Sequence, residues 1–72
     1  MNPVRLVYMA NQIGNFFSTE DPKTAVAMIT DHLKKYWDPR MRTEIVAYLD
    51  GGGGGLDEPV RQAVLQLSNP IA

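Results

Sequence analysis

Apolar residues recur at helical spacing in four stretches of the chain. Successive residues of an α-helix lie about 100° apart around its axis, so positions three and four apart share a face. Within each stretch the apolar side chains gather on one such face, and no run alternates apolar and polar positions as a half-buried strand would. The pattern predicts four helices, at about residues 3–17, 22–37, 39–50 and 58–68.

Proline marks the predicted helix starts. The dipeptides Asn2-Pro3, Asp21-Pro22 and Asp38-Pro39 open the first three helices. Proline is tolerated at the first helical position because its missing N–H has no intrahelical partner there. The Asn or Asp side chain before it can accept a hydrogen bond from a free backbone N–H. The fourth helix follows Asp57-Glu58-Pro59, where carboxylates are favoured by the positive end of the helix dipole.

The shared faces define a predicted core of mostly large apolar side chains. If these faces meet, the chain forms a small four-helix bundle of the all-α class, which we expect to be a single domain over residues 1–72. The predicted core residues are Leu6, Met9, Ala10, Ile13, Phe16, Phe17, Ala25, Val26, Ile29, Leu33, Tyr36, Trp37, Met41, Ile45, Tyr48, Leu49, Val60, Ala63, Val64 and Leu67.

A strip of small residues remains on the first helix outside this predicted face. It contains Val4, Val7, Asn11 and Gly14. Glycine inside a helix costs about 0.5–1 kcal/mol relative to alanine. That cost is reasonable where another backbone approaches closely, whether it belongs to this chain or to a partner.

Five consecutive glycines, residues 51–55, separate the third and fourth helices. One glycine suits a helix C-terminus because it accepts a positive φ, but ordering five costs much backbone entropy. We therefore expect a mostly flexible, glycine-rich tether before the last helix. The run is not a phosphate-binding loop, because the carboxylates of Asp57 and Glu58 follow where such a loop has lysine and a hydroxyl residue.

Composition narrows the classes of function. The chain has 72 residues, no cysteine, one histidine and a net charge of −1. A chain this small buries only about 60% of its unfolded surface, so it needs support, and without cysteine a partner protein is the remaining source. The balanced charge provides no field for nucleic acid or an anionic membrane. No membrane span or signal peptide is evident, so we expect a cytoplasmic protein.

Catalytic chemistry has no evident constellation in the sequence. His32 is the single imidazole, and its helical neighbours Met28, Ile29 and Tyr36 are not metal partners. Serine at helix ends usually serves as a cap. We therefore predict no catalytic, cofactor-binding or metal-binding residue in this chain.

Residues 34–42 form the densest candidate for binding. They contain four cations, one anion and two aromatic residues around the Asp38-Pro39 corner. Arginine, tryptophan, tyrosine and methionine are enriched in protein interfaces. The competing interpretation is that Tyr36, Trp37 and Met41 are ordinary core and the cations a solvated rim. Adding the small-residue strip and a leucine off the core face of the last helix, the predicted partner interface is Asn11, Gly14, Trp37, Arg40, Met41, Arg42 and Leu65.

Several sequence blocks resemble those of one family. They include residues 9–13 (Met-Ala-Asn-Gln-Ile), the Phe16-Phe17 pair, residues 36–42 (Tyr-Trp-Asp-Pro-Arg-Met-Arg) and Val60-Arg61. Over roughly residues 6–67 the chain resembles the small delta subunit of soluble, NAD-dependent, molybdenum-containing formate dehydrogenases.

The resemblance implies membership of a complex that oxidises formate to carbon dioxide and reduces NAD. By resemblance, the alpha subunit carries molybdopterin and iron–sulfur clusters, and the beta subunit carries FMN, a cluster and the NAD site. A gamma subunit carries a further cluster. The delta subunit is then expected to be a cofactor-free accessory that docks on the alpha subunit. The alternatives are a free-standing helical module that regulates or binds nucleic acid, and a small enzyme. In isolation, self-association through the apolar strip is a further expectation.

Overall fold

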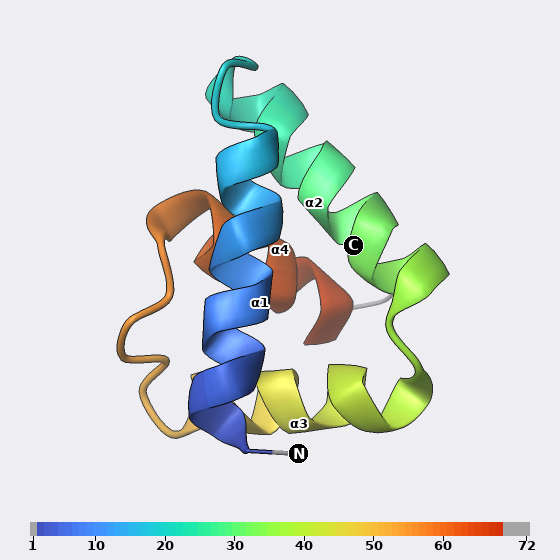
Figure 1. The fold of residues 1–72 in the computed structure, drawn as a ribbon, viewed down its shortest axis with the longest axis vertical. Coiled ribbons are helices and arrows are strands. Elements are labelled where there is room, and N and C mark those ends of the chain that lie inside the picture. Colours follow the sequence, from blue (N-terminus) through green and yellow to red (C-terminus); the bar gives the residue numbers. More distant parts are fainter. Residues whose placement is uncertain (1, 69–72) are drawn as a thin grey trace.

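Four helices build the chain, as the computed structural model describes it over residues 2–68 (Figure 1). They are α1 (Pro3–Phe16), α2 (Pro22–Tyr36), α3 (Pro39–Asp50) and α4 (Glu58–Ser68). No strand occurs within the described residues. The all-α prediction is confirmed, and the predicted helix ends differ from the observed ends by at most one residue.

The first three helices begin as the proline signals predicted. The side chains of Asn2, Asp21 and Asp38 accept hydrogen bonds from N–H groups in the first turns of α1, α2 and α3, at 2.9, 3.1 and 2.9 Å. Thr24 donates to Asp21 from both its hydroxyl and its amide, and these bonds lower the pKa of the Asp21 carboxyl. Each cap satisfies a backbone donor that a helix leaves free.

The helices form a wedge around a small core. In Figure 1, α1 and α2 meet at the turn between them and spread apart towards α3, while α4 lies behind them. α4 packs against each of the other three helices. The buried cluster consists of Leu6, Val7, Ala10, Ile29, Leu33, Trp37, Ile45, Leu49, Val60, Ala63 and Val64.

The predicted core face of α1 was partly wrong. Phe16, assigned to the core, is 80% exposed, whereas Val7 and Gly14, assigned to the strip outside it, are buried. The reason is the position of the last helix. A Cβ added to Gly14 would lie 2.5 Å from Val60 Cγ2, so α4 lies directly against the strip. The close approach that Gly14 permits is therefore internal to this chain.

The predicted core position of Tyr36 was also wrong. Tyr36 ends α2 and is 72% exposed, while Trp37 is only 6% exposed. Trp37 has extended backbone, with φ −87° and ψ 134°, and its N–H donates to Leu33 O at 3.1 Å. Leaving the helix at this residue directs the indole into the core, and the tyrosine one position earlier faces outward.

The glycine run differs from the flexible tether expected from composition, because it folds into a hydrogen-bonded loop. Gly53 has a φ of +66° and is buried against Leu49, so a side chain there would be both strained and obstructed. Its N–H donates to Tyr48 O at 3.1 Å, and the Tyr48 hydroxyl donates to the carbonyl of Gly54. These bonds offset part of the backbone entropy that is lost when the five glycines are ordered.

Candidate docking surface

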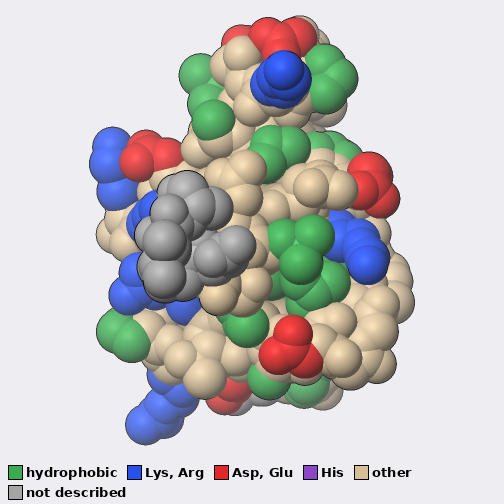
Figure 2. Space-filling view, turned by 180° about the vertical axis from the view of Figure 1, so that it is seen from behind, with side chains coloured by type: hydrophobic (Ala, Val, Ile, Leu, Met, Phe, Trp, Pro, Cys, Tyr) green, Lys and Arg blue, Asp and Glu red, His purple; other side chains and the backbone are tan. Residues whose placement is uncertain are grey.

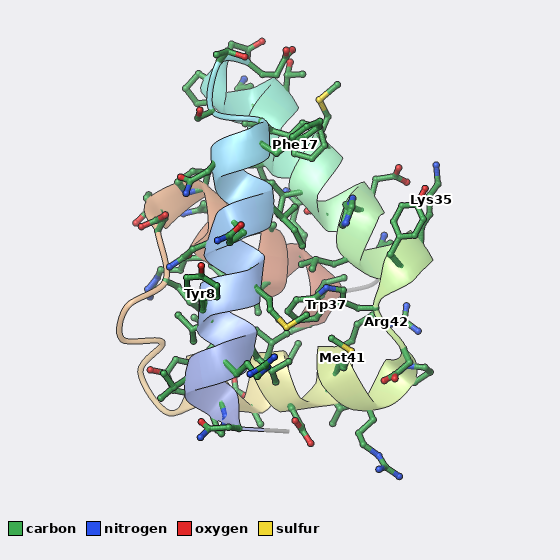
Figure 3. All side chains as sticks on the ribbon, viewed as in Figure 1. Tyr8, Phe17, Lys35, Trp37, Met41 and Arg42 are labelled. Carbon is green, nitrogen blue, oxygen red and sulfur yellow. The ribbon has the colours of Figure 1, made fainter. Side chains whose placement is uncertain are left out.

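The corner between α2 and α3 carries most of the predicted interface. Met41 is half-buried against the core, whereas Arg40 is exposed. Figure 3 shows Trp37 between α1 and α2 with Met41 close to it on α3. The positions of Trp37 and Arg40 agree with the interpretation of a core aromatic residue and a solvated rim, whereas Tyr36 departs from it because it is exposed. Binding of a partner by residues 34–42 stays a prediction.

Cations surround this corner. Arg42 is half-buried, and its Nη1 donates to the carbonyl of Lys34 at 3.4 Å, which ties α3 to the last turn of α2. Lys35 pairs with Asp31 at 3.1 Å, and that hydrogen bond raises the pKa of the lysine. We name Lys34, Lys35, Arg40 and Arg42 the basic corner. Figure 2 shows Lys and Arg side chains gathered along the corresponding edge of the molecule, on the left of that view.

A second surface lies between α1 and α2, where the two helices diverge. Two hollows, of about 270 and 540 Å³, share Gln12, Ile13 and His32 in their lining. Nothing that lines them is a lysine, arginine, aspartate or glutamate. We name this surface the aromatic face; it consists of Tyr8, Met9, Gln12, Ile13, Phe16, Phe17, His32, Tyr36 and Trp37.

Aromatic rings dominate this face and contact one another. The rings of Phe16 and Phe17 meet edge to face, with centroids 5.0 Å apart, and the rings of His32 and Tyr36 lie 4.7 Å apart. Tyr8 is 63% exposed. Because Trp37 lines one of the hollows, the aromatic face is continuous with the α2–α3 corner.

Sequence reasoning missed Tyr8 and Phe16 as interface candidates, and it considered Tyr36 only within residues 34–42 without naming it among the interface residues. Phe16 and Tyr36 were assigned to the core, and Tyr8 was assigned neither to the core nor to the predicted interface. The available signal was an excess of large side chains, because one narrow face of an α-helix cannot bury every bulky residue of the predicted stripe.

The other predicted interface residues have internal contacts or lie elsewhere. The Asn11 amide donates to Gly55 O at 2.9 Å, and its Oδ1 accepts from the N–H of Asp57 at 3.0 Å, so this side chain joins α1 to the glycine loop. Gly14 faces α4. Leu65 is 42% exposed on α4 and lines neither surface. The role of all seven residues in a partner interface stays a prediction.

Within residues 2–68 the structure places no three His, Cys, Asp or Glu side chains where they could hold a metal ion. In that same part of the chain, each helix is too short or too polar to cross a membrane.

Comparison with known proteins gives one family. The family described as the NADH-dependent formate dehydrogenase delta subunit matches residues 5–64 of the 72-residue chain. No curated protein and no solved structure gives a significant match.

Proposed function

The chain belongs to the family of NADH-dependent formate dehydrogenase delta subunits, and from that premise we propose a noncatalytic accessory role in the cytoplasm. In this proposal the chain docks on the catalytic alpha subunit of a complex that also holds beta and gamma subunits. Docking supports assembly and stability of the cofactor-loaded enzyme.

The aromatic face is the observation that carries this proposal. Phe16, Tyr8 and Tyr36 keep most of their surface exposed, while the core is filled mainly by smaller aliphatic side chains. An aromatic side chain can bury about 150–250 Å², at roughly 25 cal/mol per Å² of apolar area. The isolated chain gains little of that free energy, whereas a partner covering the face would gain it.

The basic corner adds specificity to the same docking surface. Arg40 is exposed beside half-buried Met41, at the end of the aromatic face that Trp37 lines. Rim charges mainly guide association and orientation, whereas buried aromatic residues supply affinity. Trp37, Arg40, Met41 and Arg42 remain proposed contact residues. Asn11, Gly14 and Leu65 have no such support from their positions.

The cofactors of the complex belong, in this proposal, to the other subunits. Iron–sulfur clusters are held mainly by cysteine thiolates, and this chain has no cysteine. The donor set of the chain therefore does not fit a cluster, and we assign molybdopterin, iron–sulfur clusters and FMN to its partners.

Preferential binding provides the mechanism. A protein that binds the mature alpha subunit more tightly than its empty or open form shifts the population towards the mature state. At a free concentration 100 times the Kd, that shift is about 2.7 kcal/mol. This chain then stabilises the enzyme without touching its substrate.

Copurification with the tagged alpha subunit tests the proposal. We expect Phe16→Ser combined with Tyr36→Ser to weaken binding by at least about tenfold, and Arg40→Ala to weaken it by about twofold to fivefold. Val4→Ser and Lys23→Ala are matched controls, because both residues are exposed but line neither the aromatic face nor the corner. Circular dichroism should show unchanged helix content in all four variants. Retention of full affinity by both test variants contradicts docking through these surfaces.

The alternative nucleic-acid-binding module is tested with the same protein. It predicts affinity for an oligonucleotide that falls steeply with salt and depends on Arg40 and Lys34. We expect no such affinity at 150 mM salt, because the net charge of the chain is −1.

A further inference from the structure

A third hollow lies at the opposite end of the molecule from the basic corner. It has a volume of about 430 Å³ and lies where the end of α1, the start of α2 and the start of α4 come together. Its apolar lining includes Ala25, Val26 and Pro59, with Gly14 contributed by α1. The hollow is thus separate from both surfaces used in the proposed function.

The hollow lies beside the close approach of α1 and α4. Gly14, which faces Val60, is one of its lining residues, and Ser18 after α1 and Glu58 at the start of α4 line it further out. Among the lining residues Gly14 and Ala25 are buried and Val26 and Pro59 are half-buried, so part of the wall is formed by packed elements of the fold. Such a site is available without rearrangement of the fold.

Carboxylates provide all the formal charge of the lining. They belong to Glu20, Asp57 and Glu58, and no lysine or arginine lines the hollow. The Glu58 carboxylate accepts a hydrogen bond from Gln62 at 2.7 Å. Neither Glu20 nor Asp57 forms an ion pair with another residue in the described part of the chain. Lys23 lines an adjoining hollow between α2 and α4, which shares Val26 and Gln62 with this one.

We propose that this acid-rimmed hollow is a second docking site, which receives an apolar side chain from a basic segment of a partner protein. The apolar side chain would lie against Ala25, Val26 and Pro59. Lysine or arginine on either side of it would face Glu20, Asp57 and Glu58. Charge complementarity selects this occupant, because an acidic segment or a phosphate backbone would be repelled by three carboxylates.

Short peptides titrated into the isotopically labelled full chain test the site. The probe is Lys-Arg-Leu-Arg-Lys, and its controls are Lys-Arg-Ser-Arg-Lys and Glu-Asp-Leu-Asp-Glu. We expect the probe to shift the amide resonances of Gly14, Ser18, Val26 and Gln62. The serine peptide should bind at least about tenfold more weakly, because it has no apolar side chain to bury, and the acidic peptide should not bind.

Charge variants separate the hollow from the rest of the surface. Glu20→Gln combined with Asp57→Asn should weaken binding of the probe by about threefold to tenfold, and both substitutions keep the size of the side chain. Asp31→Asn combined with Asp50→Asn removes the same charge from exposed positions outside the hollow, so its affinity should stay within about twofold of the parent.

Three results would overturn the proposal. They are equal binding of the acidic peptide, an equal loss in both double variants, and resonance shifts confined to other residues. Shifts of the same four amides on concentrating the chain alone would identify a second copy as the occupant, which also contradicts a basic partner segment. None of these results bears on docking through the aromatic face.

Discussion

The two sides of α1 are built from side chains of very different size. Towards α4 and the glycine loop the helix presents Val7, Asn11 and Gly14, each in contact with another part of the chain. Towards the space beside α2 it presents Tyr8 and Phe16, which are mostly exposed. The chain closes its small-residue side by itself and leaves its aromatic side open.

The two sides of α1 therefore contribute to different free energies, one to folding and the other to binding of a partner. Contacts on the side of α4 contribute to folding, because they are made within the chain. The aromatic side contributes to folding only where it reaches the core, and the rest of its apolar surface is available to a partner. Substitutions on the side of α4 should therefore change the free energy of unfolding, whereas substitutions of exposed residues on the aromatic side should change the affinity for a partner.

Trp37 belongs both to the buried core and to the aromatic face, and its truncation should have the largest effect. We expect Trp37→Ala to lower the free energy of unfolding by about 3–5 kcal/mol, because the indole is almost wholly buried and the neighbouring helices can fill the cavity only partly. For a domain of this size that loss is enough to leave much of the population unfolded. Chemical denaturation followed by circular dichroism measures it.

Trp37→Phe is the control for this prediction. It retains an aromatic ring in the core, so it should cost less than the alanine substitution, and its binding to the alpha subunit can be measured on folded protein. A Trp37→Ala variant as stable as the parent would show that the indole is not part of the core.

The contact between Gly14 and Val60 should produce the next largest effect. Gly14→Ala gains up to about 1 kcal/mol of helix propensity but forces a methyl group against Val60, and overpacking costs about 1–3 kcal/mol. We expect a net destabilisation of about 1–2 kcal/mol. Urea denaturation of the single variant measures it.

A double-mutant cycle makes this second prediction specific. Val60→Ala removes the methyl group that Gly14→Ala would meet, so the double variant should be less destabilised than the sum of the two single variants, by about 0.5–3 kcal/mol. Additive effects would show that α1 and α4 do not approach each other here.

Local signals in the sequence predicted the helices well because the physics of a helix start is local. Asp21 and Asp38 each accept a hydrogen bond from the N–H group three residues later. The proline that follows each aspartate suits the first helical position whatever the rest of the fold does. The inward faces of α3 and α4 were also correct. Ile45, Leu49, Val60 and Val64 are buried as their spacing predicted.

The core face of α1 could not be predicted from that helix alone. Its sequence offers two apolar faces, one small and one aromatic, and the choice depends on where α4 returns after residues 51–57. The hydrophobicity of Phe16 favours the aromatic face, whereas the close packing that Gly14 permits favours the other. The glycine run posed the same difficulty, since one of its partners, Asn11, lies 44 residues away in the sequence from Gly55.

The candidate site was accordingly predicted in part. Arg40 is exposed as an interface cation must be, and its place at a proline corner follows from residues next to it in sequence. Tyr8 and Phe16 became candidates only once the helices were placed, because exposure is a property of the assembled fold.

Asn11 tests the closed side of α1 with an expected effect no larger than that of Gly14→Ala. Asn11→Ala removes the two hydrogen bonds that join the helix to Gly55 and Asp57, and we expect it to cost about 1–2 kcal/mol of unfolding free energy. Besides the lower free energy of unfolding of the whole chain, we expect the structure around Asp57 to open more often, since the amide of Asp57 would lose its acceptor. Hydrogen exchange at that amide should therefore accelerate more than exchange in the middle of α2.

Two further substitutions give this prediction its control and its mechanism. Gln12→Ala, one position along on the aromatic face, should change stability by less than about 0.5 kcal/mol. Asn11→Asp keeps the acceptor for the Asp57 amide but loses the donor to Gly55 O, so it should protect that amide while still destabilising the loop. If Gln12→Ala lowered the free energy of unfolding as much as Asn11→Ala, the two sides of α1 would contribute equally to folding. That result would contradict the interpretation that the aromatic face serves a partner rather than the fold.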